Sequence, residues 1–402
     1  MTARSVPNAI LLIVTSISVS LHLATRELWR NRGRFMLFSM VIALITVLVL
    51  FIAALAEGLA DVNRQYLSKL NAELVVLGDR ADGILTASRV GRSRMAAVDR
   101  IDGVAAAGAI GFSSANVIDP LPKNGSPLRV SLVGVEPGKP GEPPAIQGRS
   151  LSTIQAAEVV LDRGVLNQLK LNVGDSLTIQ TTQGTQDQTY TLKVVGVSDN
   201  ETYLFQPTLF VPMFTWDRIR PKGEGESASS ELTVGAIAVK LDDPTQAVAM
   251  RQRILDTIAR VEVQTVRETY EKLPGYSAQQ STLTTQSVFT LLIGVLVIGG
   301  FFQIQILQKV PQIGVLKAIG ASNATVGTAA VLQIVLVTAI GVFVGSALTL
   351  GLSLGMPASV PVAFTGAGVA TAVAALLLIG PIGGSVSVRY AIQIEPLRAL
   401  GL

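Results

Sequence analysis

The chain has 402 residues, of which 49% are hydrophobic and 15% are charged, and its mean hydropathy is +0.50. Soluble domains carry about 25% charged residues, so this composition excludes an ordinary soluble protein and predicts that much of the chain lies in lipid. The sequence contains no cysteine, which excludes thiol catalysis and cysteine metal sites and leaves any extracytoplasmic domain without disulfides.

The N-terminal region, residues 1–34, contains an uncharged stretch at 5–25 followed by a basic cluster. Apolar side chains fall on one face of this stretch at helical spacing, and polar ones, His22 among them, fall opposite. That pattern is typical of a helix lying in the membrane interface, which we expect here. A signal peptide and a fifth span are alternatives, although no small-residue cleavage site precedes the basic cluster.

Four uncharged apolar runs reach the length of about 20 residues that a helix needs to cross the hydrocarbon core. They cover residues 35–56, 287–308, 328–354 and 363–387. The last two are separated by GMPASVP, in which two prolines and a glycine favour a turn. None of the four runs contains an ionisable side chain, which argues against a proton- or ion-coupled carrier.

Charge is distributed unevenly along the chain. Residues 57–272 carry a net charge of −3, whereas the remainder carries +7, on short segments that flank the predicted spans. Because the positive-inside rule counts these segments, we expect residues 1–34, 309–327 and 388–402 to face the cytoplasm. The sequence therefore predicts a multi-pass protein of the cytoplasmic (inner) membrane with both termini cytoplasmic. Topology, rather than nucleic acid binding, then explains the pI near 9.4.

Residues 57–286 separate the first two predicted spans. Their start continues the first span as a charged, amphipathic stalk helix, and a strand–helix–strand pattern follows near each end of the region. Two such pieces predict a discontinuous α+β subdomain closed by its first and last segments. Within 169–197, apolar residues alternate on both sides of a TQGTQ turn, the signature of a β-hairpin. The predicted fold class is membrane α-helical: four transmembrane helices, with a large extracytoplasmic α+β domain inserted between the first and second spans.

The sequence offers no strong catalytic or cofactor site. The phosphate-loop pattern G-x-x-x-x-G-K-[ST] is absent, so ATP would have to act through another polypeptide. His22 is a weak candidate for a haem ligand, and one histidine cannot build a zinc site. Ser346 and Ser385 each follow a glycine, but small residues in spans more often let helices pack, which disfavours an intramembrane protease. We predict a non-enzymatic chain with no catalytic, cofactor-binding or metal-binding residues.

A polar segment, LQKVPQIGVLKAIGASNATV, interrupts the apolar C-terminal half at residues 307–326. It resembles the cytoplasmic segment of FtsX-like permeases, whose usual pattern is close to R-x-x-E-I-G-[IV]-L-[KR]-A-[LI]-G-A-[ST]. The stretches LATRELWRNRGRFMLFSMVIALITVLV, GRSLSTIQAAEVVLDRGVLNQLKLNVGDSLTIQ and AIQIEPLRALG are similar to other parts of that family. The order of one span, a large outer domain and three more spans matches its macrolide-exporter, MacB-like type.

The resemblance implies that this segment is a short helix docking into a groove on an ATPase partner. The residues expected at that contact are Gln312, Ile313, Gly314, Leu316, Lys317, Ile319, Gly320 and Ala321. Their types fit: three apolar side chains spaced i, i+3 and i+6 predict an apolar knob, small residues permit close approach, and the lysine supplies a charge. Gln312 replaces the family's usual acidic residue, and a neutral amide cannot form a carboxylate's salt bridge. The alternative is a mere connector.

We therefore expect the permease subunit of an ATP-binding-cassette efflux or mechanotransmission complex, driven by a separate ATPase subunit that binds the ATP. The expected partners are that ATPase, a second copy of the permease, membrane lipid and, in some envelopes, an adaptor protein, but no nucleic acid. The alternative is an FtsX-like signalling regulator that passes ATPase motion to an extracytoplasmic hydrolase without transport. Macrolide, haem, lipid, peptide and lipoprotein all remain open as cargo.

Overall fold

The computed structural model describes residue 26 and residues 29–82, 84–85, 87–122, 125–199, 201–203, 206–222, 232–273, 275–356 and 360–394. The chain divides into two compact units. The membrane unit comprises Met1–Leu59 and Gln280–Leu402, and the outer unit comprises Ala60–Gln279. The interfacial helix, signal peptide or fifth span considered for residues 5–25 lies outside the described residues.

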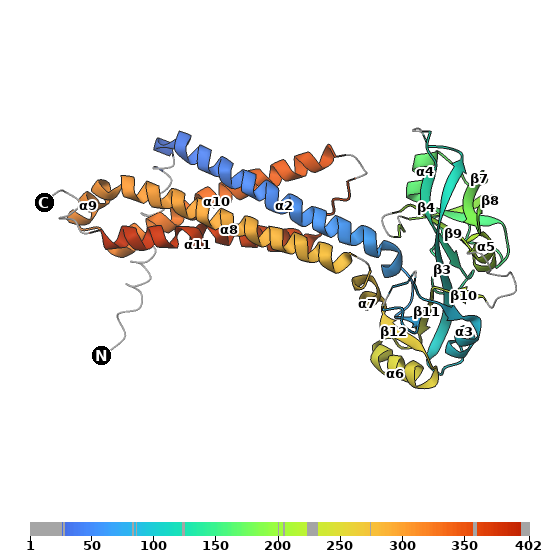
Figure 1. Ribbon diagram of the computed structural model, residues 1–402. Coiled ribbons are helices and arrows are strands. Elements are labelled where there is room, and N and C mark those ends of the chain that lie inside the picture. The colour runs from blue at the N-terminus through green and yellow to red at the C-terminus, as the bar shows by residue number, and fades with distance from the viewer. Residues whose placement is uncertain are drawn as a thin grey trace. The chain divides into compact units, whose positions relative to one another are not determined.

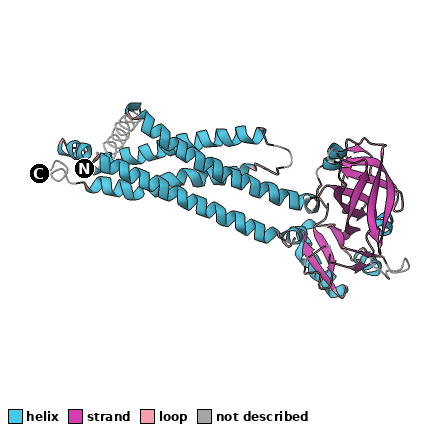
Figure 2. Ribbon diagram, turned by 45° about the horizontal axis from the view of Figure 1, so that its top comes forward, coloured by secondary structure: helices cyan, strands magenta, loops and turns pink. Residues whose placement is uncertain are grey.

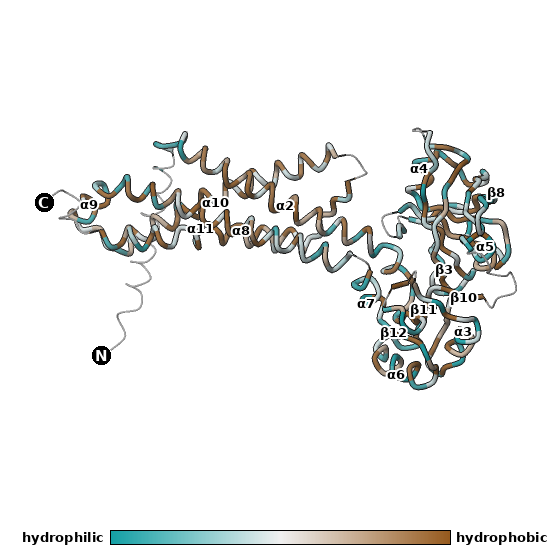
Figure 3. Tube along the Cα trace, in the orientation of Figure 1, coloured by the Kyte–Doolittle hydropathy of each residue, from teal (hydrophilic) through white to brown (hydrophobic). Residues whose placement is uncertain are grey.

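Within the described residues, four helices of the membrane unit are long and apolar enough to cross a membrane. They are α2 (Arg32–Ser68), α8 (Tyr276–Gln308), α10 (Asn323–Leu354) and α11 (Gly366–Gln393). Figure 3 shows them as largely hydrophobic, and the short helix α9 (Val310–Ala318) joins α8 to α10. Each long helix continues past the uncharged run that predicts it, because a helix can extend into the interface, where polar residues are hydrated. The four-helix prediction is confirmed.

Small residues let the helices of the membrane unit approach closely. Gly341 and Gly345 form a G-x-x-x-G pair on α10, and both are buried. A Cβ atom on Gly341 would lie 2.6 Å from Ile42 of α2, and one on Gly345 would lie 2.5 Å from Thr46. Gly299 of α8 and Gly383 of α11 also lie in close contact, because neither residue has a side chain to separate the two backbones. These contacts are the means by which helices pack in lipid, where no hydrophobic force drives them together.

The described strands all belong to the outer unit (Figure 2). They are β1 (Leu74–Gly78), β2 (Val90–Gly91), β3 (Val104–Asp119), β4 (Leu128–Val135), β5 (Gln147–Gly148), β6 (Glu158–Asp162), β7 (Ser176–Gln183), β8 (Gln186–Ser198), β9 (Thr208–Pro212), β10 (Thr233–Val234), β11 (Ala236–Leu241) and β12 (Val261–Thr265). The helices of this unit are α3 (Arg92–Val98), α4 (Arg163–Leu169), α5 (Met213–Ile219), the 3₁₀ turn η1 (Pro244–Gln246), α6 (Ala247–Thr257) and α7 (Val266–Glu271).

Ten strands form one sheet in the order β12-β1-β11-β3-β4-β9-β6-β8-β5, with β7 pairing with β3 and β8 (Figure 1). Strand β1, the first after α2, lies between β11 and β12, the last two of the unit, and is antiparallel to both. The first and last segments therefore close the subdomain as the sequence predicts. Strands β7 and β8 form the predicted hairpin, with Gln183 opposite Gln186 across the turn.

The sheet buries both of its faces. Along β1, Leu74 and Val76 belong to one apolar cluster, whereas Val75 and Leu77 belong to another. This alternation follows from the two-residue period of a strand, and it explains why the sequence of β1 is apolar throughout. Helices α3 to α6 cover the first face. The last turns of α2, through Tyr66 and neighbouring leucines, contribute to the core on the second face.

Candidate coupling site

Helix α9 occupies most of the segment predicted to contact an ATPase. It begins after Lys309, with Pro311 in its first turn. Proline is tolerated there because N–H groups of the first turn have no acceptor within the helix. It ends in a Schellman motif: Ala321 N donates to the carbonyl of Leu316 (3.0 Å), and Gly320 N donates to that of Lys317 (3.0 Å). Gly320 takes φ +101°, which a residue with a Cβ rarely adopts. The sequence therefore fixes both ends of this helix.

One face of α9 packs on the membrane unit itself. Ile313 is 9% exposed and lies in a small apolar cluster with Ile306 of α8, Val326 and Ala330 of α10, and Ala391 of α11. Gly314 is buried beside it, and the half-buried Leu316 and Ala321 pack against the same cluster. Here α9 is anchored to three of the long helices.

The opposite face carries a second set of apolar side chains. Ile319 is 77% exposed and Val315 is 48% exposed, one turn apart. The exposed Gln312 precedes them on the same face, and Gly320 is exposed at the end. The predicted knob of Ile313, Leu316 and Ile319 is thus wrong as a single face: Ile313 and Leu316 are turned inward, and Ile319 outward. Val315 is not among the residues expected at the contact, although its i, i+4 spacing from Ile319 signals a shared face.

Lys317, also expected at the ATPase contact, is bound within the membrane unit. Its Nζ donates to the carbonyl oxygens of Ile392 (2.7 Å) and Ile394 (2.9 Å), at the C-terminal end of α11. The last carbonyls of a helix lack partners within it and carry partial negative charge, so an ammonium group stabilises them. Lys317 therefore ties α9 to α11, in addition to the apolar cluster.

Two polar groups join the N-terminal end of α2 to the region where α8 ends. Arg34 donates through its guanidinium to Oε1 of Gln308, and Lys309 Nζ lies 5.8 Å from the ring centroid of Phe35. Lys309 also donates to Gln333 Oε1 of α10 over 3.4 Å. These contacts hold α2, α8 and α10 together beside α9.

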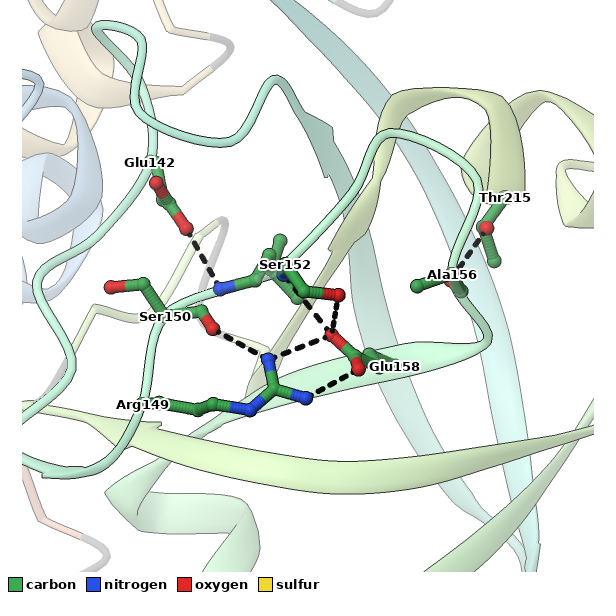
Figure 4. Close-up of polar contacts among 8 residues, drawn as sticks. Glu142, Arg149, Ser150, Ser152, Ala156, Glu158 and Thr215 are labelled. Carbon is green, nitrogen blue, oxygen red and sulfur yellow. Dashed lines mark hydrogen bonds and ion pairs between the residues drawn. The ribbon is translucent and has the colours of Figure 1, made fainter.

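The outer unit contains two polar clusters, and the first pins a loop. Glu158, at the start of β6, accepts hydrogen bonds from Arg149 Nη1 (3.0 Å), Ser152 N (3.1 Å) and Ser152 Oγ (2.9 Å), and Arg149 Nη2 also contacts it (Figure 4). The hydrogen bonds from Arg149, chief among the causes, lower the pKa of Glu158 to about 2. In the same view, Glu142 accepts from Leu151 N. These bonds hold the loop that carries Arg149 and Ser152 against the start of β6.

The second cluster links Gln65 of α2 and the following Lys69 to Asp199 and residues 201–203. Lys69 Nζ donates to the carbonyl of Asp199 (2.6 Å), and Thr202 Oγ1 donates to Gln65 Oε1 (2.6 Å). Glu201 is 2% exposed, and its Oε2 has no hydrogen-bond partner among the described residues. Burial, opposed by Lys69, raises the pKa of Glu201 to about 7. Sequence reasoning missed this cluster because its members are far apart along the chain.

Two family models cover most of the chain. The MacB-like periplasmic core domain matches residues 35–257, and the FtsX-like permease C-terminal domain matches residues 285–396. The second match begins within α8, contains α9 to α11 and hence covers the whole candidate coupling site.

Relatives align over nearly their full length. A protein of Staphylococcus haemolyticus is 26% identical over 388 residues, covering 95% of this chain and 99% of the relative. One from Staphylococcus epidermidis is 24% identical over 392 residues, with the same coverage. Both carry the provisional name hemin transport system permease protein HrtB.

Two solved structures align with about half of the chain. The periplasmic region of MacB from Actinobacillus actinomycetemcomitans is 12% identical with a TM-score of 0.35, covering 49% of this chain and 90% of that one. The extracellular domain of the transporter YknZ from Gram-positive bacteria is 13% identical with a TM-score of 0.33, covering 48% and 98%. Both scores are low, so the assignment rests on the family models. The chain belongs to the MacB-like, FtsX-like family of ATP-binding-cassette permeases.

Proposed function

We propose that this permease is driven by a separate ATPase subunit through the outward face of α9, which Val315 and Ile319 form. The observation that carries the proposal is the two-sidedness of this helix. One face is packed on three long helices, and the other exposes two aliphatic side chains at the end of the bundle that carries the basic segments. An apolar face on a short, anchored helix suits a groove on another protein.

The anchoring supports a mechanical role. Ile313 packs against α8, α10 and α11, and Lys317 binds the end of α11. A force applied to the outward face would therefore move three spans together rather than deform a loop, because packed side chains transmit displacement. Movement of these spans is the step through which ATP turnover would reach the rest of the permease.

The test compares three aspartate substitutions of exposed aliphatic residues. Val315→Asp and Ile319→Asp should each weaken co-purification with the ATPase by about tenfold or more, since one buried aliphatic side chain contributes roughly 1.5–3 kcal/mol and 1.4 kcal/mol is a factor of ten. Val248→Asp on α6, where the side chain is 81% exposed, is the matched control and should leave association unchanged. Wild-type association of both α9 variants would show that the segment is only a connector.

The ATP would be bound and hydrolysed by the partner, and the permease would need no cofactor of its own. Support comes from the missing phosphate loop in the sequence. Purified permease should show no ATP turnover, and turnover that stays with this polypeptide after removal of every ATPase subunit would contradict the proposal.

The charge map supports an orientation with α9 and both termini in the cytoplasm. Because the chain has no cysteine, single cysteines can be introduced cleanly. A cysteine at Ser126 should react with an impermeant reagent in intact cells, and one at Ser322 only after permeabilisation. Labelling at position 322 in intact cells would show that α9 lies on the outer side of the membrane and would contradict this orientation.

Two permease copies would pair with two ATPase subunits, because four spans are few for a translocation pathway. Between α2 and α10 lies an apolar groove of about 620 Å³ whose lining includes Met36, Met40, Ile340, Val344 and Leu348. Such a groove suits a span of a second copy, and disulfide crosslinking between copies carrying Met40→Cys would test it. An adaptor protein would be an additional partner where the cell envelope requires one.

Hemin is the cargo to test first, because the curated relatives are named for hemin transport. The permease with its ATPase should show ATP turnover that hemin stimulates, and its deletion should sensitise cells to hemin. Unchanged turnover and sensitivity would favour another cargo, or signalling without transport.

A further inference from the structure

A pocket of about 470 Å³ opens beside α9 in the membrane unit, and neither Val315 nor Ile319 lines it. Its polar lining comes from three cationic and three amide side chains: Arg26, Arg30, Lys309, Asn31, Gln312 and Gln333. The rest of the wall is apolar and is contributed by α8, α9, α10 and α11. The pocket thus has one strongly basic side and one hydrocarbon-like side.

The charges of this pocket are not balanced by carboxylates in the described part of the membrane unit. No hydrogen bond or ion pair joins Arg26 or Arg30 to a described residue, whereas Lys309 donates to Gln333 and has further contacts. Glu57 is the one acidic side chain among the described residues of this unit, and it lies more than about 35 Å along α2 from Arg32. Glu27 and Glu395 lie outside the described residues.

We propose that this pocket binds the headgroup of an anionic phospholipid, with the phosphate at Arg26, Arg30 and Lys309 and the start of an acyl chain along the apolar wall. Basic pockets between spans on the cytoplasmic side suit such headgroups, because the phosphate attracts the cations and the acyl chain covers the hydrocarbon wall. A small soluble anion would leave that wall uncovered. The pocket also borders Ile313 and Leu316, so the bound lipid would brace the anchored face of α9.

The experiment counts lipids bound to the purified full-length permease by native mass spectrometry during titration with phosphatidylglycerol or phosphatidylcholine. Wild type should bind one phosphatidylglycerol molecule preferentially. Arg30→Gln should weaken that binding about fivefold, and Arg26→Gln combined with Arg30→Gln about 25-fold, since each cation near a membrane surface contributes a factor of about five. Melting temperatures without added lipid should stay at the wild-type value, because both side chains are exposed.

Arg389→Gln is the matched control. Arg389 is an exposed cation near the end of α11 and does not line the pocket, so its loss should change binding by less than about twofold. An equal loss in Arg389→Gln and Arg30→Gln would overturn the proposal in favour of diffuse attraction. Equal binding of the two lipids would also overturn it. Displacement of phosphatidylglycerol by millimolar inorganic phosphate or glycerol phosphate would assign the pocket to a soluble anion instead.

Discussion

The outer unit and the membrane unit are each stabilised internally in a different way: large side chains fill the core of the first, whereas small residues permit close helix contacts in the second. In the outer unit, large aliphatic and aromatic side chains fill both faces of the sheet, since removing them from water stabilises the fold. In the membrane unit, glycines occupy the closest helix contacts, because lipid is as apolar as the helix surface and only close packing favours association. The same change in volume should therefore have opposite consequences in the two units.

The largest effect should come from removing volume in the outer unit. Trp216 of α5 lies against Gly111 and Gly134, which are paired across β3 and β4, and its Nε1 donates to Ser113 Oγ (2.9 Å). Glycines cannot fill the space that the indole leaves, so Trp216→Ala should lower the free energy of unfolding of the outer unit by about 3–5 kcal/mol. Denaturant-dependent proteolysis of the full-length chain measures this.

The exposed Val248 provides the matched control for that truncation. Val248→Ala should change the free energy of unfolding by less than about 0.5 kcal/mol. Equal changes in the free energy of unfolding for Trp216→Ala and Val248→Ala would show that the stability of this unit does not depend on buried side-chain volume.

Buried charge should produce the next largest effect. The folded-state pKa of Glu201 is about 7, against 4.5 ordinarily, so between these values the folded state holds a proton that the unfolded state has lost. The contribution of Glu201 to stability is therefore fully present below about pH 4.5 and is lost as the pH rises towards 7, by on the order of 3 kcal/mol. Glu201→Gln should abolish this fall and be more stable than wild type at pH 8.

Two comparisons make the pH experiment specific. The control Asp242→Asn, at an exposed carboxyl group, should keep the wild-type slope between pH 4.5 and 7. Glu158 acts in another window with the opposite sign, because its pKa is lowered to about 2 and its contribution is lost only as the pH falls from about 4.5 to 2. A wild-type slope in Glu201→Gln would assign the pH dependence to other groups.

Adding volume should destabilise the membrane unit. Gly345→Leu would place a side chain where Thr46 of α2 leaves no room, at a cost of about 1–3 kcal/mol, whereas Gly351→Leu on the same helix meets nothing within 4 Å. Melting in detergent should fall for the first variant and not for the second. Equal melting temperatures would mean that α2 and α10 do not depend on this close approach.

The sequence predicts what depends on local composition. Charge-free length marks the four spans, and alternation marks the β7–β8 hairpin, because each signal is contained in the segment itself. It does not predict which way α9 faces. At about 100° per residue, an i, i+3, i+6 series drifts, so that Ile319 lies about 120° around the helix from Ile313. Lys317 binds carbonyl groups at the end of α11. Its partner Ile392 is 75 residues away in the sequence, so no local pattern predicts this contact.

The smallest effect expected concerns this lysine. Lys317→Met keeps a long apolar stem and removes the ammonium group that binds the carbonyls of Ile392 and Ile394. The loss of a cation at a helix C-terminus should lower the stability of the membrane unit by about 0.3–1 kcal/mol, and up to about 2 kcal/mol in this half-buried setting.

The effect of Lys317→Met on coupling should exceed its effect on ATPase association, because Lys317 joins α9 to α11 and does not lie on the outward face. Lys317→Arg should restore part of the coupling, since a guanidinium can also donate to both carbonyls. The measurement is cargo-stimulated ATP turnover beside co-purification. A variant that fails to bind the ATPase would place Lys317 at the intersubunit contact instead of within the permease.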